Sequence, residues 1–204
     1  MAEVTLARRP PLEDLAKPGR YGSSAGEPPV VISPRNGIAM VQIAAFPGKE
    51  AEFREVCRRV SGVEPSPEPK RVTAGGLAFV GMGPHEWLAL ADGDAAKAVL
   101  KDLGAQLSGI GSFIEQSDGK VVVRLAGQRA RGVLAKGCML DLDRRVFKPG
   151  DAAITQVALI PCQLWLLDES PSFELAVPSS YAESFWSWLV TSAAEFGYEV
   201  TPPL

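Results

Sequence analysis

The chain has 204 residues, a formal net charge of -3 and a pI near 5.3. This length can bury a sizeable core in one domain or two small ones, while the acidic balance and scattered basic residues argue against a nucleic-acid partner. The first residues carry two arginines without an apolar run behind them, and no stretch approaches about 20 apolar residues. We therefore expect neither a secretory signal nor a membrane span, and a cytoplasmic protein.

Residues 1–36 are rich in proline and glycine, with serines between them. Proline fixes the backbone φ angle and glycine loosens the chain, so this composition predicts an N-terminal arm without a core of its own. Such an arm is either disordered or laid along a partner surface, and the sequence alone does not separate these alternatives.

Two passes of similar length then repeat one order of elements: a strand, a helix, two strands and a closing amphipathic helix. The first pass is predicted as a strand at 38–46, a helix at 49–60, strands at 77–83 and 86–91, and a helix that Asp92-Gly93-Asp94 caps. The second is predicted as a strand at 121–126, a helix at 128–137, strand-like runs at 153–160, 163–168 and 173–178, and a last helix from Ser180 with Glu183 in a capping box.

This repetition predicts an α+β fold of duplicated strand-helix-strand-strand-helix halves with mostly antiparallel sheets. We expect the arm to cover residues 1–36 and one duplicated domain to cover 37–204, with halves at approximately 37–112 and 113–200. The apolar stripe of the last helix supports this assignment, because six apolar residues recur there at helical spacing. They are Ala182, Phe185, Trp186, Leu189, Ala193 and Phe196.

Trp188 does not fit that stripe. At about 100° per residue it lies well away from the centre of the apolar face, on a flank that it shares with Tyr181. Trp and Tyr are favoured anchors of protein interfaces, so Tyr181 and Trp188 are candidate contacts with a partner. The alternative is that the arm or a neighbouring loop of the same chain covers them.

Catalytic and cofactor-binding motifs are not found in the sequence. There is no Gly-x-Gly-x-x-Gly loop between a strand and a helix, and no Walker lysine motif. His85 is the one histidine, and Cys57, Cys138 and Cys162 are far apart and free of Cys-x-x-Cys spacing, so a zinc site and a disulfide framework are poorly supported. We predict no catalytic, cofactor-binding or metal-binding residue.

A few polar residues remain open to more than one interpretation. Asp118 precedes the strand that opens the second pass, and is the acidic residue that we can name for a pocket between the halves. Asp141 and Asp143 cap a turn or ligate an ion. A cysteine hydrolase would use Cys138 or Cys162 with His85 as its base.

The second half contains a series of short motifs: Val-Arg-Leu-Ala-Gly (123–127), the Ala-Arg-x-Val-Leu-Ala-Lys-Gly-Cys-x-Leu-Asp-Leu run (130–142), Phe-x-Pro-Gly (147–150), Thr-Gln (155–156) and Phe-Glu-Leu-x-Val-Pro (173–178). Through these motifs it resembles the gamma subunit of heterotetrameric sarcosine oxidase. In the first half, Gly-Pro-x-x-Trp-Leu (83–88) looks like the same family, and the start of the arm (8–15) is similar to it.

This resemblance implies a non-catalytic assembly subunit of a complex that oxidatively demethylates sarcosine to glycine and H2O2 and passes the one-carbon unit to tetrahydrofolate. Whether the chain alone is an enzyme stays open. The resemblance implies that FAD, FMN, NAD, zinc and tetrahydrofolate are held by other subunits. The implied partners are the alpha, beta and delta subunits, mainly alpha, with neither nucleic acid nor membrane. The implied fold is that of the folate-binding domain of aminomethyltransferases.

The alternative function is a stand-alone folate-binding or aminomethyltransferase-like protein. It requires an acidic residue in the pocket between the two halves, for which Asp118 is the candidate.

Overall fold

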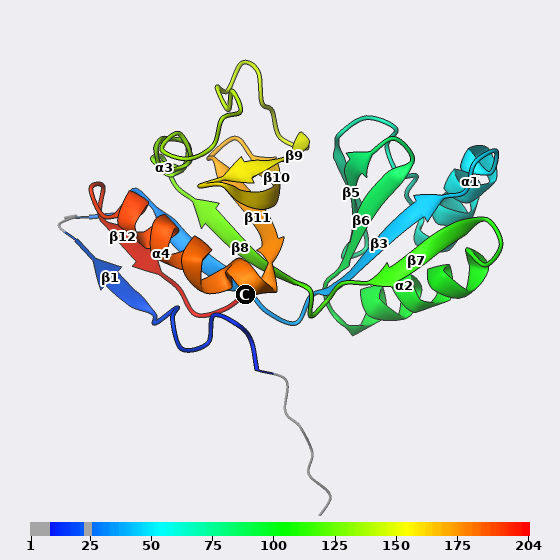
Figure 1. The fold of residues 1–204 in the computed structure, drawn as a ribbon, viewed down its shortest axis with the longest axis horizontal. Coiled ribbons are helices and arrows are strands. Elements are labelled where there is room, and N and C mark those ends of the chain that lie inside the picture. The colour runs from blue at the N-terminus through cyan, green and yellow to red at the C-terminus, as the bar shows by residue number, and fades with distance from the viewer. Residues whose placement is uncertain (1–8, 23–25) are drawn as a thin grey trace, which may run out of the picture.

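Two β-sheets stand side by side in the computed structural model, each with helices on the face that points away from the other (Figure 1). The structure describes residues 9–22 and 26–204. The fold is mixed α+β with sheets dominated by antiparallel pairs, as the sequence predicts. The exception is the short parallel pairing of β12 with β2.

The first sheet has five strands in the order β4-β5-β6-β3-β7. Its elements are β3 (Ala39–Ala45), α1 (Glu50–Ser61), β4 (Arg71–Ala74), β5 (Leu77–Gly83), β6 (Glu86–Ala91), α2 (Asp94–Gln106) and β7 (Gly111–Glu115). The i, i+3, i+4 spacing of Phe53, Val56 and Cys57 buries one face of α1, and Gly62 ends that helix in the left-handed conformation at φ 77°.

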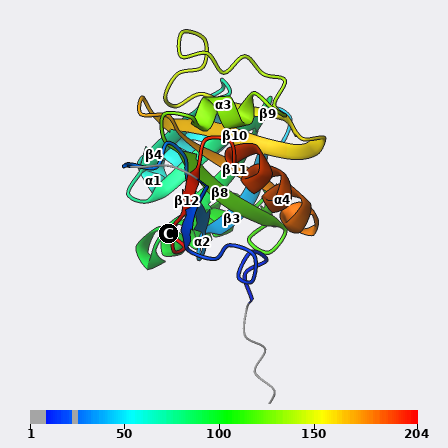
Figure 2. The same cartoon turned by 90° about the vertical axis from the view of Figure 1, so that its left-hand side faces the viewer.

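The second sheet has seven strands in the order β1-β12-β2-β8-β11-β10-β9. Its elements are β1 (Gly19–Tyr21), β2 (Val31–Arg35), β8 (Lys120–Ala126), α3 (Ala130–Leu134), β9 (Ala152–Val157), β10 (Ile160–Asp168), β11 (Ser172–Pro178), the 3-10 turn η1 (Ser179–Tyr181), α4 (Ala182–Ala193) and β12 (Tyr198–Val200). Helices α3 and α4 cover the same face of this sheet, as Figure 2 shows from its side.

Both halves run strand, helix, three strands, helix, strand in chain order. Four strands of each sheet also correspond, since β4-β5-β6-β3 of the first sheet has the same order as β9-β10-β11-β8 of the second. The position that β7 takes beside β3 in the first sheet is occupied beside β8 by β2, which comes from the N-terminal segment. The order of elements therefore repeats more fully than the sequence pattern predicts.

The N-terminal segment differs from the expected arm. Of its described residues, β1 and β2 are strands of the second sheet, and Leu12, Val30 and Ile32 are buried in the core beneath α4. A segment rich in proline and glycine can still be ordered when another part of the chain supplies the core and the missing strand partners, as α4 and β8 do here. Residues 1–8 lie outside the described part.

A third apolar cluster joins the two sheets through their inner faces. Alternate residues of β5 and β6 point into it, as the period-2 geometry of strands requires, and β3, β8, β9, β10 and β11 each contribute one buried residue. Its largest members are Trp165, Leu88, Leu90, Ile38 and Met40. Backbone hydrogen bonds add to the junction, because the amides of Arg71 and Ala152 donate to Gly150 and Pro69 respectively.

Two local predictions are wrong in detail. The turn between β9 and β10 is at Ala158-Leu159, with φ of 52° and 65°, so Pro161 and Cys162 lie inside β10. Neither residue is a glycine or an asparagine, and the sequence therefore carries no signal for a left-handed turn there. Helix α4 begins at Ala182 after a 3-10 turn, and its N-cap residue is Tyr181, which makes no side-chain cap, so the capping box expected at Ser180 and Glu183 does not form.

The expected side-chain cap of α2 does not form either. Gly93 is its N-cap residue and makes no side-chain hydrogen bond there. Asp94 lies in the first turn, where its charge still interacts favourably with the helix dipole.

Candidate functional site

A pocket of about 260 Å³ lies between the two sheets, beside the apolar cluster that joins them. Strands of both halves supply its walls, since β2, β8 and β11 belong to the second sheet and β4, β5 and β6 to the first. Its charged lining residues are Arg35, Arg71, Asp92, Arg124 and Glu174. A pocket that needs both halves exists only when the two sheets are packed together.

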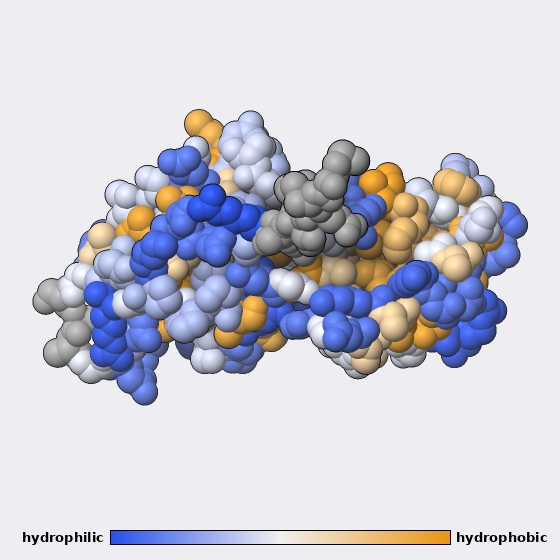
Figure 3. Space-filling model, turned by 90° about the horizontal axis from the view of Figure 1, so that it is seen from below, coloured by the Kyte–Doolittle hydropathy of each residue, from blue (hydrophilic) through white to orange (hydrophobic). Residues whose placement is uncertain are grey.

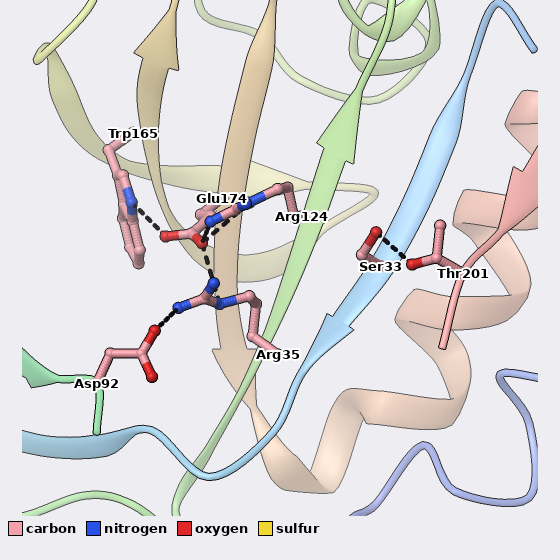
Figure 4. Close-up of polar contacts among 7 residues, drawn as sticks. All are labelled: Ser33, Arg35, Asp92, Arg124, Trp165, Glu174 and Thr201. Carbon is pink, nitrogen blue, oxygen red and sulfur yellow. Dashed lines mark hydrogen bonds and ion pairs between the residues drawn. The ribbon is translucent and has the colours of Figure 1, made fainter. Parts of the chain in front are cut away.

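Glu174 stands at the centre of a row of polar residues that crosses the second sheet. In the strand register Trp165 of β10 lies opposite Glu174, Glu174 opposite Arg124 of β8, and Arg124 opposite Ser33 of β2. The row ends where the Ser33 hydroxyl accepts a hydrogen bond from Thr201 at 2.7 Å (Figure 4). Directly opposed residues on one face are close enough to interact, so the register itself assembles this cluster.

Both carboxylate oxygens of Glu174 accept hydrogen bonds, although the residue is only 3% exposed. Oε1 accepts from Arg124 Nη2 at 2.7 Å and from Arg124 Nε at 3.3 Å, and Oε2 accepts from the Trp165 indole at 2.9 Å (Figure 4). Arg35 Nε forms an ion pair with the same Oε1 at 3.2 Å, but its angle does not make a hydrogen bond. Burial of this carboxylate is therefore compensated by paired charges and donors.

Arg35 connects the cluster to the first half. Its Nη2 donates to Asp92 Oδ2 at 2.7 Å, directly after β6, while its Nε faces Glu174. The side chain of Arg35 is 13% exposed and that of Asp92 is 59% exposed. The Arg35–Asp92 pair is therefore the outer edge of the cluster, and the Glu174 pairs are its buried centre.

Arg71 enters the pocket from β4 and is the least compensated of the three arginines. No hydrogen bond or ion pair of its side chain is found among the described residues, and its buried Nε has no acceptor there. Burial lowers the pKa of Arg71; the charge of Glu174 opposes this effect, and the nearby Arg124 and Arg35 add to it. The pocket therefore holds a partly buried cation that has no ion-pair partner among the described residues.

None of these charged residues was predicted as a site residue from the sequence; Asp92 was expected only to cap a helix. A signal was present, since Arg124 and Glu174 each interrupt an otherwise apolar strand and carry opposite charges. Two such interruptions indicate a buried pair if the strands are neighbours in register, and this adjacency is decided by the sheet. Arg35 and Arg71 carried no such signal, because each lies at the end of a short strand beside a loop.

The two predicted interface residues lie at different depths. Tyr181 ends the 3-10 turn and is 45% exposed. Trp188 is half-buried: its ring lies 6.0 Å from that of Phe185, and the edge of its indole passes so close to Gly137 that a Cβ there would come within 2.7 Å. A loop of the same chain thus covers part of Trp188, and its role as a partner contact stays a prediction.

The other singled-out residues are not brought into one site. Asp118 lines a second pocket, which Ile38 and Met40 of the first half and Lys120 of the second also line, whereas Glu174 is the acidic residue of the pocket between the sheets. His85 is exposed at the β5–β6 turn, whereas Cys162 and Cys138 are buried in the core of the second half. Burial raises the pKa of the Cys162 thiol, which disfavours the nucleophilic thiolate.

Asp141 and Asp143 cap turns. Asp141 accepts from the amide of Asp143, and Asp143 accepts from the amide and the guanidinium of Arg145. Over residues 9–22 and 26–204, no three His, Cys, Asp or Glu side chains are grouped as a metal site requires. Nor does any helix in that part of the chain have the length and apolar character of a membrane span.

Comparison with solved structures defines the class of fold. The chain is similar to the glycine cleavage system aminomethyltransferase T from Bartonella henselae, with a TM-score of 0.60 and 13% identity over 84% of this chain and 47% of that one. The protein is thus an α+β body of the aminomethyltransferase type. At this identity the likeness concerns the fold alone.

Closer relatives define the family. The family model "Sarcosine oxidase, gamma subunit family" matches residues 50–195, and the chain belongs to that family. It is 32% identical to the sarcosine oxidase gamma subunits of Corynebacterium sp. (strain P-1), over 98% of this chain and 96% of that one, and of Arthrobacter sp., over 96% and 95%. A chain of the heterotetrameric sarcosine oxidase from Corynebacterium sp. U-96 has a TM-score of 0.80 at 28% identity, covering 93% of this chain and 96% of that one.

Proposed function

We propose that this chain is a structural gamma subunit that assembles with alpha, beta and delta subunits, mainly alpha, into a sarcosine oxidase. The observation that carries the proposal is the similarity to a chain of a heterotetrameric sarcosine oxidase along nearly the full length of both chains. The complex would convert sarcosine to glycine and H2O2 in the cytoplasm, with transfer of the one-carbon unit to tetrahydrofolate. FAD, FMN, NAD, zinc and the folate would be bound by the other subunits.

The state of the polar groups supports a structural role. The carboxylate between the halves is ion-paired with Arg124 and hydrogen-bonded to Trp165, and these contacts stabilise its ionised form and make it a weak general base. The thiols are buried and His85 lies in an exposed turn far along the chain from them. In the part of the chain that the structure describes, no thiol hydrogen-bonds to the His85 ring, the contact that a cysteine hydrolase would need.

For the alternative, a stand-alone folate-binding or aminomethyltransferase-like protein, Glu174 is already paired, which leaves Asp118 at the second pocket as the candidate acidic residue. That function needs an acidic side chain available between the halves. Calorimetric titration of the purified chain with tetrahydrofolate tests it directly, and we expect no binding heat at high micromolar ligand.

We also propose that the chain is organised as an N-terminal segment, 1–36, and a duplicated body with halves near 37–112 and 113–200. The repeated order of elements and the matching order of four strands in each sheet support this division. In this proposal β2 of the N-terminal segment completes the second half.

For the partner contact we propose a surface made of Tyr181, Trp188, Met139 and Leu159, here called the α4 flank. Met139 is 94% exposed and Leu159 is 85% exposed. Leu159 also holds a left-handed backbone conformation that a leucine adopts at a cost. The amide of Ala158, beside Leu159, donates to Gly137, against which Trp188 packs, so Leu159 and Trp188 belong to one loop contact.

An exposed apolar side chain and a strained backbone both lower the stability of the folded chain, and such features are concentrated at functional surfaces. By contrast, the face of the molecule seen in Figure 3 is largely hydrophilic over the half that carries the seven-stranded sheet. This contrast favours the α4 flank over that lower face as the contact with a partner.

Co-expression with the three other subunits tests the assembly. We expect the chain to elute with them in size-exclusion chromatography, and a stable monomer that never enters the complex would contradict the proposal. Leu159→Asn, which suits the left-handed turn and removes the apolar side chain, should weaken assembly about tenfold or more when combined with Tyr181→Ser. Ile114→Thr, at a half-exposed position on β7, is the matched control and should assemble like the wild type.

A further inference from the structure

The charged pocket between the sheets contains more positive than negative groups. Three arginines, Arg35, Arg71 and Arg124, face two carboxylates, Glu174 and Asp92. Both oxygens of Glu174 are already used by Arg124, Arg35 and Trp165, and Asp92 pairs with Arg35 at the solvent edge. One positive charge is therefore left over, and the geometry assigns it to Arg71.

Two buried donors in this pocket make no hydrogen bond among the residues that the structure describes: Nε of Arg71, and Nε of Arg35, which lies 3.2 Å from Glu174 Oε1 at an unfavourable angle. Buried donors without a hydrogen bond are rare in folded proteins, because desolvation of the N–H group is then not repaid. Both atoms belong to guanidinium groups, whose planar array of N–H donors matches the two oxygens of a carboxylate or a phosphate.

We propose that this pocket binds a small oxyanion, a carboxylate or phosphate group, between Arg71 and Arg35. Its volume of about 260 Å³ lies just below the range usual for drug-sized ligands, so it suits a small anion or the acidic end of a larger molecule. Thr73 of β4 also lines the pocket and adds a hydroxyl group. Every residue of the site belongs to this chain, so the proposal does not depend on the proposed assembly.

The alternative role of Arg71 is purely structural, as a cation that Glu174 holds at longer range. The two roles predict different changes in the stability of the chain when the charge of Arg71 is removed. If Arg71 is kept to bind an anion, removing its charge should leave stability unchanged or raised when no oxyanion is present, because a half-buried cation without a partner is removed. If Arg71 supports the fold, the same change should destabilise the chain in every buffer.

The experiment uses the full-length chain in Tris–chloride buffer, with inorganic phosphate and acetate as probes. Isothermal titration and thermal unfolding should both show saturable binding, with the melting temperature rising as the probe is added. Arg71→Met should weaken binding about tenfold or more, as expected for loss of a charge-assisted hydrogen-bonding partner. Arg144→Met makes the same charge change at an exposed position and should stay within about twofold of the wild type.

A second measurement needs no variant. The 15N shift of the Arg71 Nε should move on addition of phosphate in the wild-type chain, while that of Arg144 should not. Absence of saturable binding to the wild type, or equal losses in Arg71→Met and Arg144→Met, would overturn the proposal, since the response would then be general screening. If Arg71→Met does not fold, Arg71→Lys keeps the charge without the planar fork and should still bind more weakly.

Two sources could supply the oxyanion, a free small molecule or an acidic side chain of a partner subunit. Repeating the titration on the co-expressed complex separates them. Binding to both the lone chain and the complex indicates a free anion. Binding to the lone chain that disappears in the complex indicates that a partner's carboxylate occupies the pocket.

Discussion

Glu174→Gln is the sharpest test of how the two halves are held together. The substitution keeps the volume of the side chain but removes the charge that two guanidinium groups share. Glu174 is 3% exposed, and the side chains of Arg35 and Arg124 are 13% and 29% exposed, so water can replace little of the lost interaction. The amide group of glutamine would also place donors where Arg124 donates.

Removing one partner of a buried ion pair costs about 3–5 kcal/mol, and the partial exposure of Arg124 favours the lower end. We therefore expect Glu174→Gln to lower the free energy of unfolding by about 3 kcal/mol. For a chain of this size this corresponds to a fall of about 6–12 °C in the melting temperature. Urea titration followed by tryptophan fluorescence, with a differential scanning experiment beside it, measures both quantities.

The matched control is Glu169→Gln, which removes the same charge from an exposed turn and should change the unfolding free energy by less than about 0.5 kcal/mol. In a double-mutant cycle with Arg124→Gln the two losses should be non-additive by about 1–3 kcal/mol. The reasoning is refuted if Glu174→Gln unfolds within about 0.5 kcal/mol of the wild type with an unchanged dependence on urea.

Three further outcomes follow from local geometry. Gly81→Ala should lower the free energy of unfolding by about 1–3 kcal/mol in urea titrations, because the new Cβ would lie 2.8 Å from a backbone oxygen of the preceding loop. Gly83→Ala in the same strand is the control: its Cβ meets nothing closer than 3.8 Å, and the change should be near neutral. Burial raises the pKa of the Cys57 thiol to about 12, above its unfolded value of 9.0. The contribution of this thiol to the free energy of unfolding is therefore complete below pH 9 and is lost as the pH rises toward 12. Cys57→Ala should reduce that alkaline loss of stability in unfolding curves, and a pH dependence equal to that of the wild type would contradict the buried thiol. Hydrogen bonds from Arg145 lower the pKa of Asp143 to about 2, so the contribution of Asp143 is present above its unfolded pKa and lost as the pH falls through 2; carboxyl 13C titration of Arg145→Met should show this pKa returning toward 3.8.

Local pattern was sufficient for most of the helices and strands. The stripe of α4, from Ala182 to Ala193, is buried as its spacing predicts, and α1 buries Phe53, Val56 and Cys57. These predictions succeed because helix and strand periodicity is a property of neighbouring residues, which a single sequence contains. The mixed α+β class and the predominance of antiparallel pairs followed from the same patterns.

Predictions that needed a partner distant in the chain were weaker. The sequence predicts an N-terminal arm without a core of its own, because the segment is short and rich in proline. In the structure Leu12 and Ile32 are buried in the core of the second half, and β2 pairs with β8. The β9–β10 turn was misplaced because Ala158 and Leu159 hold left-handed conformations that only the surrounding contacts stabilise.

The sequence by itself determined the periodic elements, the duplicated order of those elements and, through its family motifs, membership of the gamma subunit family. Only the tertiary structure decided that Glu174 and Arg124 face each other, that Arg35 and Arg71 join them from distant strands, and that one positive charge is left over in the pocket. The physical reason is that the sequence shows a charged residue within an apolar strand, and therefore a desolvation cost, but not the residue that pairs with it. That partner depends on strand register and on the packing of one sheet against the other.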